Sequence, residues 1–252
     1  MNAVPLRFSF SDFNKELTAL RKIVNGFLDR GAAVIMENLA IQLDLIQRDS
    51  GNRECPFEVS EEAPLRTIES THFEGQGRKA RPVIGSISWK WMIKPVRIGN
   101  SKCSDFDVVG LASTKLRILD ADCENETELA MWRVELGDGQ SPGCYFHTQV
   151  LGQSNVPPFP RSVCIPRLPT LFATPMAAVE FLLCELFQNE WEQHTAGDRH
   201  DLAFWNSIEK QRMKDLLNWK LGCIENTQGS PWVSMKLAKP TSNDQLFFGK
   251  KG

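Results

Sequence analysis

The residues best suited to chemistry lie on two neighbouring segments of the chain. His147 lies in one run of alternating apolar and polar residues, and Arg133 and Glu135 lie in the run before it. A histidine beside a carboxylate can act as a general base, because the carboxylate orients the ring and stabilises its protonated form. No nucleophile motif such as GxSxG accompanies this histidine. His147 and Glu135 are therefore the candidate catalytic pair, and the alternative is a structural or ligand-contacting histidine.

Alternation with a period of two predicts four strands, over residues 83–94, 106–119, 129–136 and 144–151. The apolar positions would form a buried face of the sheet, and the polar positions a second, wetter face. That second face would be locally basic, with Asp107 and Glu135 as its only acids. Its predicted binding residues are Lys90, Lys115, Arg117, Arg133, Tyr145, His147 and Gln149. Such a surface could bind phosphate-bearing ligands or single-stranded nucleic acid, or it could be an ordinary solvated face.

Two other segments could extend this surface. Arg78 and Lys79 lie among glycines in EGQGRKARP, which predicts a basic loop that either touches phosphate or stays solvated. Five prolines mark residues 152–173 as an extended arm, because proline fixes φ and lacks a backbone donor. The arm would either dock a partner or cover an edge of the sheet.

Several kinds of site are missing from the sequence. The seven cysteines include no CxxC pair, which argues against a disulfide framework and against a structural zinc site. The segment HTAGDRHD, from His194 to Asp201, matches no standard spacing of metal ligands and predicts a polar turn between helices. There is no GxxxxGK[ST] loop and no dinucleotide fingerprint. We therefore predict no metal and no cofactor.

The elements around these residues predict an α+β fold in a single domain over residues 1–252. Residues 11–48 would form an N-terminal helical hairpin, capped at Ser11 or Asp12 and broken at Arg30 and Gly31. Residues 49–82 would be a loop, residues 83–151 a four-stranded, mostly antiparallel sheet, and residues 152–173 the arm. A helix pair over 174–222, capped by Thr174 and stopped at Gly222, would pack on the apolar face of the sheet. The tail over 223–252 would hold one edge strand around residues 232–237.

The overall charge and hydropathy narrow the functional classes. A net charge of −2 creates no field that would draw the whole protein to nucleic acid or to an anionic membrane. No apolar run approaches the ~18 residues of a membrane span, and the first residues lack the pattern of a signal peptide. These features predict a cytoplasmic protein without membrane contact.

Together, these observations predict a non-enzymatic binding or assembly subunit of a bacterial-type multi-protein complex. It would hold a protein partner, with nucleic acid as a further ligand, on the polar sheet face and the proline-rich arm. The alternative is an enzyme that acts on a phosphate-containing substrate or nucleic acid at a site centred on His147. An enzyme should gather His147, Glu135 and Arg133 in one concave pocket, whereas a binding subunit should present a flat face or a large apolar patch.

Overall fold

The computed structural model describes residues 5–48, 53–73, 81–97, 103–123, 126–137, 143–150, 168–197, 199–226 and 228–241. Within these residues eight strands form one antiparallel sheet: β1 (Leu6–Ser9), β2 (Cys55–Val59), β3 (Leu65–Arg66), β4 (Val83–Val96), β5 (Asp105–Asp120), β6 (Glu128–Leu136), β7 (Phe146–Val150) and β8 (Leu168–Pro169). The helices are α1 (Phe10–Ile23), α2 (Arg30–Arg48), α3 (Pro175–Thr195), α4 (His200–Glu225) and α5 (Pro231–Leu237). The α+β class is confirmed, but the predicted four-stranded sheet is too small. No helix in the described residues is both long and apolar enough to cross a membrane.

The sheet is built around two long strands, β4 and β5. Its order is β2-β4-β5-β6-β7-β8, with β1 added to one end of β5 and β3 to β4. Between Lys90 and Met92, β4 advances two residues, while β5 advances four between Val109 and Ser113. The excess of two residues forms a bulge at Gly110, whose φ of 69° suits glycine. Because the excess is even, the apolar and polar residues keep their faces on both sides of the bulge.

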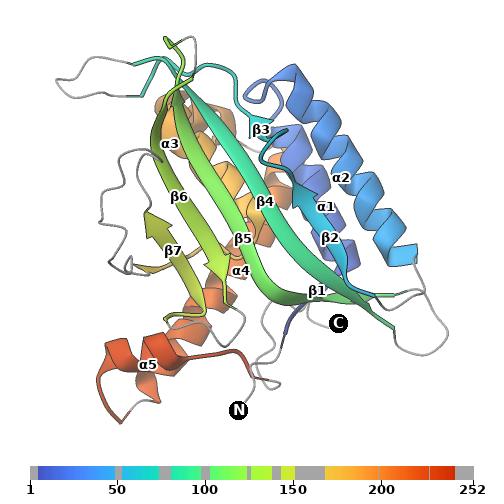
Figure 1. Ribbon diagram of the computed structural model, residues 1–252, viewed down its shortest axis with the longest axis vertical. Helices are drawn as coiled ribbons and strands as arrows, with labels where there is room; N and C mark the ends of the chain where they lie inside the picture. Colours follow the sequence, from blue (N-terminus) through green and yellow to red (C-terminus); the bar gives the residue numbers. More distant parts are fainter. Residues whose placement is uncertain are drawn as a thin grey trace.

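Helices α1 to α4 lie on one side of the sheet, and within the described residues the other face of β4–β7 carries no helix (Figure 1). The apolar strand residues and the apolar helix faces merge into one buried cluster. Phe13 of α1 packs against Trp91 of β4 and Phe106 of β5. Helix α3 lies directly on β4 at Gly85, where an added Cβ would come within 2.8 Å of Leu186. The apolar face of the sheet is thus the floor of the core, as the alternation predicts.

Two helix starts follow from short capping signals. The Thr174 side chain accepts a hydrogen bond from the Ala177 backbone N–H, and Pro175 occupies the first turn, so α3 begins as predicted. Helix α1 begins two or three residues earlier than predicted, because Ser9 is the cap in place of Ser11 or Asp12 and accepts a hydrogen bond from the Asp12 N–H at 3.4 Å.

The N-terminal third departs from the prediction in two other places. The break predicted at Arg30 and Gly31 is wrong, since α2 begins at Arg30 and the turn between the helices lies earlier, around Gly26, whose φ is 95°. The loop predicted over 49–82 contains β2 and β3. Pro56 hid β2 from the pattern, and it is tolerated there because β2 is at the end of the sheet order.

The C-terminal region also differs. Helix α4 continues through Gly222 to Glu225, and the stop is Asn226, whose backbone and side-chain N–H groups both donate to the Gly222 carbonyl. The edge strand predicted at 232–237 is wrong, because those residues form α5 after Ser230, with Pro231 in its first turn. Helix α3 packs on the sheet as predicted, whereas α4 packs mainly on α1. The single-domain organisation stays a prediction.

Candidate functional site

The strand register brings the predicted polar residues together on the sheet face that has no helix. Antiparallel pairing places them in two rows across β4, β5, β6 and β7. The first row is Lys90, Ser113, Glu135 and His147, and the second is Ser88, Lys115, Arg133 and Gln149. Directly opposed side chains in such rows lie close enough to interact. Sequence alternation therefore located a real cluster of polar groups.

His147 sits at the centre of a hydrogen-bonded chain and is almost sealed from solvent, with 1% of its surface exposed. Its Nδ1 lies 2.9 Å from the Cys144 carbonyl oxygen, and its Nε2 lies 3.0 Å from Oε2 of Glu135. Oε1 of Glu135 forms a 2.9 Å ion pair with Nε of Arg133. Arg133 in turn donates a hydrogen bond to the Gln149 side chain.

The partners of His147 constrain its chemistry. Both ring nitrogens lie within hydrogen-bonding distance of an oxygen atom of the protein itself, so both are occupied by internal contacts. The ring is also buried, and only 5% of the Glu135 surface is exposed. The arrangement is that of a buried contact between side chains that joins β6 to β7.

A polar hollow of about 460 Å³ lies beside this pair on the same sheet face. Arg133 lines it, but neither His147 nor Glu135 does. Its charged residues are Glu58, Glu61, Glu62, Lys90, Lys115 and Arg133, and Ser88 and Ser113 also line it. The hollow is thus walled by three acids and three bases. The predicted catalytic groups and the concave part of the face are adjacent but distinct.

This face of the sheet is less basic than predicted. Glu61, from the connection between β2 and β3, forms ion pairs with both Lys115 and Arg117. The hydrogen bond from Lys115, helped by the charges of Lys115 and Arg117, lowers the pKa of Glu61. Arg117 also lies 3.3 Å from a carboxylate oxygen of Glu128. Carboxylates other than Asp107 and Glu135 therefore neutralise much of the predicted positive charge.

Two other predicted binding positions do not join the site. Tyr145 belongs to the buried core and makes an edge-to-face contact with Phe146, with ring centroids 5.1 Å apart. It offers no exposed ring on which a base could stack. Arg78 and Lys79 lie outside the described residues, and so do residues 152–167 of the proline-rich arm.

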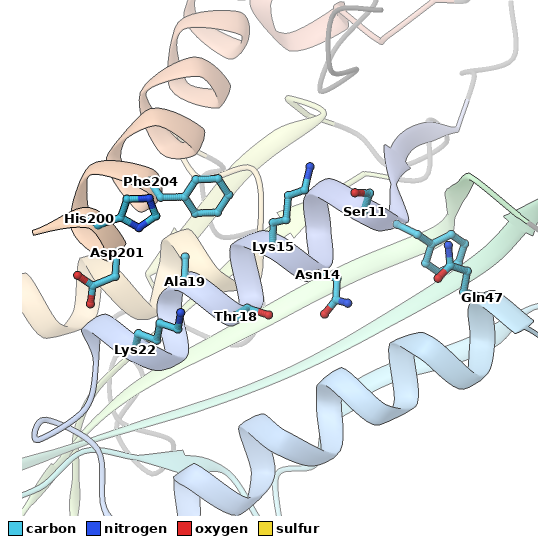
Figure 2. Close-up of a pocket in the computed structure, with 11 residues that line it drawn as sticks. Ser11, Asn14, Lys15, Thr18, Ala19, Lys22, Gln47, His200, Asp201 and Phe204 are labelled. Carbon is cyan, nitrogen blue, oxygen red and sulfur yellow. The ribbon is translucent and has the colours of Figure 1, made fainter.

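A second concavity, of about 550 Å³, runs along the solvent side of α1, and sequence reasoning missed it. Figure 2 shows Ser11, Asn14, Lys15, Thr18 and Lys22 along that helix, with His200, Asp201 and Phe204 from the start of α4 at one end. Lys15 is paired with Asp12, and Asp201 with Arg199. The groove contains no acid–base pair beside a nucleophile. His194, which belongs with His200 to the predicted polar turn HTAGDRHD, does not line this groove. Its Nε2 lies 2.7 Å from the Ile23 carbonyl oxygen.

A buried charged cluster between α1, α3 and α4 was also missed. Glu16 of α1 is fully buried, accepts a 2.6 Å hydrogen bond from the Thr174 hydroxyl and forms an ion pair with Arg212 of α4. The Arg212 guanidinium lies 5.7 Å from the centroid of the Phe8 ring. Glu209, one turn before Arg212, has a pKa well above its ordinary value because it is buried and close to Glu16. This cluster lies in the core and joins three helices.

No group of three histidine, cysteine or acidic side chains within the described ranges is placed to hold a metal ion. The comparisons with other proteins are negative: no family model, no curated protein and no solved structure matches this chain.

Proposed function

We propose that this protein is a non-enzymatic binding or assembly subunit that holds a protein partner at the polar hollow, on the sheet face that carries no helix among the described residues. The observation that carries the proposal is the hollow bounded by Glu58, Lys90 and Arg133. It is concave and polar, and it stands beside a His147–Glu135 pair whose hydrogen-bonding groups face each other. A surface that combines charged side chains with a histidine held by contacts inside the protein suits recognition better than proton transfer.

The charges of the hollow favour a protein as its occupant. Three acids and three bases line it, so it has no net charge with which to attract a polyanion. A protein surface, in contrast, carries both signs and can complement both kinds of group. Lys90 is exposed and stands opposite Glu58 in the register of β2 and β4, at the entrance of the hollow. Nucleic acid as a further ligand therefore receives no support from this face.

Site-specific photo-crosslinking in cells tests the proposal. A photoreactive amino acid replaces Glu62, on the exposed rim of the hollow, and in a matched control it replaces Lys210, on the exposed side of α4. We expect one discrete protein adduct from position 62 and no such adduct from position 210. Combining the probe with Lys90→Glu should remove the adduct, because it reverses a charge at the entrance.

Three outcomes would contradict the proposal. The first is the same adduct from both probe positions, which would mean that contact is unrelated to the hollow. The second is an adduct that is sensitive to nuclease, and the third is an adduct that survives Lys90→Glu. A folded His147→Asn variant separates the enzymatic alternative, because a binding subunit keeps its position-62 adduct without this imidazole.

A further inference from the structure

Helix α2 has two apolar stripes on opposite sides. The first faces the core and consists of Ala32, Met36, Leu39, Leu43 and Ile46, all buried. The second faces solvent: Val34, Ile41 and Leu45 are 60%, 54% and 61% exposed. At about 100° per residue the two stripes lie half a turn apart. A helix with apolar residues on both sides normally lies between two layers of structure, because each stripe gains from burial.

The residues that the structure describes supply only one of those layers. In Figure 1, α2 is the outermost helix on its side of the sheet, and no labelled element lies beyond it. The outer stripe would therefore be covered by another molecule. Its positions, Val34, Asn38, Ile41 and Leu45, are separated by four, three and four residues. This is the spacing of a coiled-coil seam, in which such residues pack against a second helix.

We propose that α2 pairs, parallel and about a twofold axis, with α2 of a second copy of this chain. Asn38 is the reason for choosing an identical partner. Buried against an apolar helix, its amide would lose hydrogen bonds to water without replacement, at a cost in stability. In a parallel symmetric pair Asn38 faces Asn38 of the second copy, and each amide can donate to the other. A single asparagine in a seam is known to fix register and oligomeric state in this way.

The charges beside the seam favour the parallel orientation. One flank carries Arg30, Glu37 and Asp44, and the other carries Ile35 and Gln42. In a parallel pair the charged flank of each helix meets the neutral flank of the other. In an antiparallel pair the charged flanks would meet, and Glu37 would lie near Asp44 of the second copy. Like charges at this distance repel, and the ion pairs of Glu37 with Arg21 and of Asp44 with Arg48 weaken this repulsion, so the charges add only a small preference for the parallel arrangement.

The seam is short, so the association should be weak. Three exposed aliphatic side chains and half-buried Ile35 provide roughly 300 Å² of apolar surface per copy, below the ~800 Å² per partner of a standard interface. We therefore expect a dimer that dissociates in the micromolar range. This inference is independent of the sheet-face proposal, because α2 contributes no residue to the hollow.

Sedimentation of the 252-residue chain between about 1 and 200 µM tests self-association. We expect a concentration-dependent dimer for the natural sequence and at least a tenfold weaker association for Ile41→Lys. Leu221→Lys is the matched control, because Leu221 is equally exposed, at 53%, on α4. Both variants should keep the helical circular dichroism signal, since neither side chain is buried. A chain that is monomeric at 200 µM, or one that Leu221→Lys dissociates and Ile41→Lys does not, overturns the proposal.

Disulfide trapping tests the orientation. The background carries Cys123→Ser and Cys184→Ser, which remove two exposed thiols. With Val34→Cys added, a parallel pair places position 34 beside position 34 of the second copy, and oxidation should crosslink the dimer. In an antiparallel pair position 34 would instead lie near position 45, so a mixture of Val34→Cys and Leu45→Cys chains would crosslink and Val34→Cys alone would not. That second result would refute the parallel arrangement.

Discussion

Replacing Arg212 with methionine should destabilise the protein strongly, and the loss should depend on pH. Arg212 is the cation of the buried cluster: it pairs with fully buried Glu16 and lies one turn from Glu209. Methionine keeps the volume and the contact with the Phe8 ring but removes the charge. The site would then hold two carboxyl groups and no compensating cation.

The magnitude follows from the burial of the pair. Breaking a buried ion pair by removing one partner costs about 3–5 kcal/mol, because the remaining charge stays desolvated. For a domain of this size each kcal/mol corresponds to about 2–4 °C in the unfolding midpoint, so we expect a fall of about 10 °C near pH 7. Because burial and the nearby Glu16 raise the pKa of Glu209, lowering the pH toward 5 protonates this carboxyl and relieves part of the repulsion, so the loss should shrink.

Urea unfolding of the two proteins at several pH values measures this effect. Arg199→Met is the matched control. The ion pair of Arg199 with Asp201 is at the surface, so its removal should not measurably change the urea midpoint. Adding Glu16→Leu to Arg212→Met should recover part of the loss, since an apolar pair replaces the stranded carboxylate. A loss below about 1 kcal/mol, or a loss that is equal at pH 5 and pH 8, would refute the assignment of Arg212 as the neutralising charge.

Three other substitutions test separate parts of the structure. Glu209→Gln removes a carboxyl group with a raised pKa, and the natural chain loses stability as the pH rises through that pKa because a buried charge then forms. The variant should therefore be more stable than the natural chain at pH 8 and equally stable below about pH 4. The opposite trend in the urea midpoints would exclude a buried acid at this position. Gly85→Ala should cost about 1–3 kcal/mol in thermal unfolding because the new Cβ meets Leu186, and no change would mean that α3 does not approach β4 so closely. His147→Ala should cost a similar amount, about 1–3 kcal/mol, because Glu135 loses a buried partner, and a stable variant would argue against a structural role.

The sequence predicted the long strands, because their apolar and polar residues alternate with a regular period of two. Strands β4 to β7 emerged from strict alternation, and the same alternation placed Lys115, Arg133 and His147 on one face. Helix α3 emerged from the Thr174 cap. Short elements were missed because they carry too few residues to show a period: β3 has two residues, and β2 has five with a proline among them.

Contacts between distant segments were beyond the reach of local patterns. Nothing near Glu61 indicates that it folds over Lys115 and Arg117, and this pairing is what removes the basic character of the face. Glu16 left a faint signal, because it occupies a core position of α1 three residues after Phe13. An acid at such a position requires a buried partner, but the partner, Arg212, lies 196 residues away in the chain.

The two proposed surfaces can act at the same time because they lie on separate parts of the molecule. The hollow opens on the sheet face that has no helix, whereas Val34, Ile41 and Leu45 lie on the side of α2 that faces away from the core. A dimer through α2 would therefore present two hollows, and a partner with two matching sites would gain affinity from the second contact without any new interaction. Ile41→Lys should then weaken such a partner while leaving the position-62 crosslink intact, whereas Lys90→Glu should remove the crosslink without changing self-association. The two substitutions thus separate assembly of the chain from recognition by its sheet.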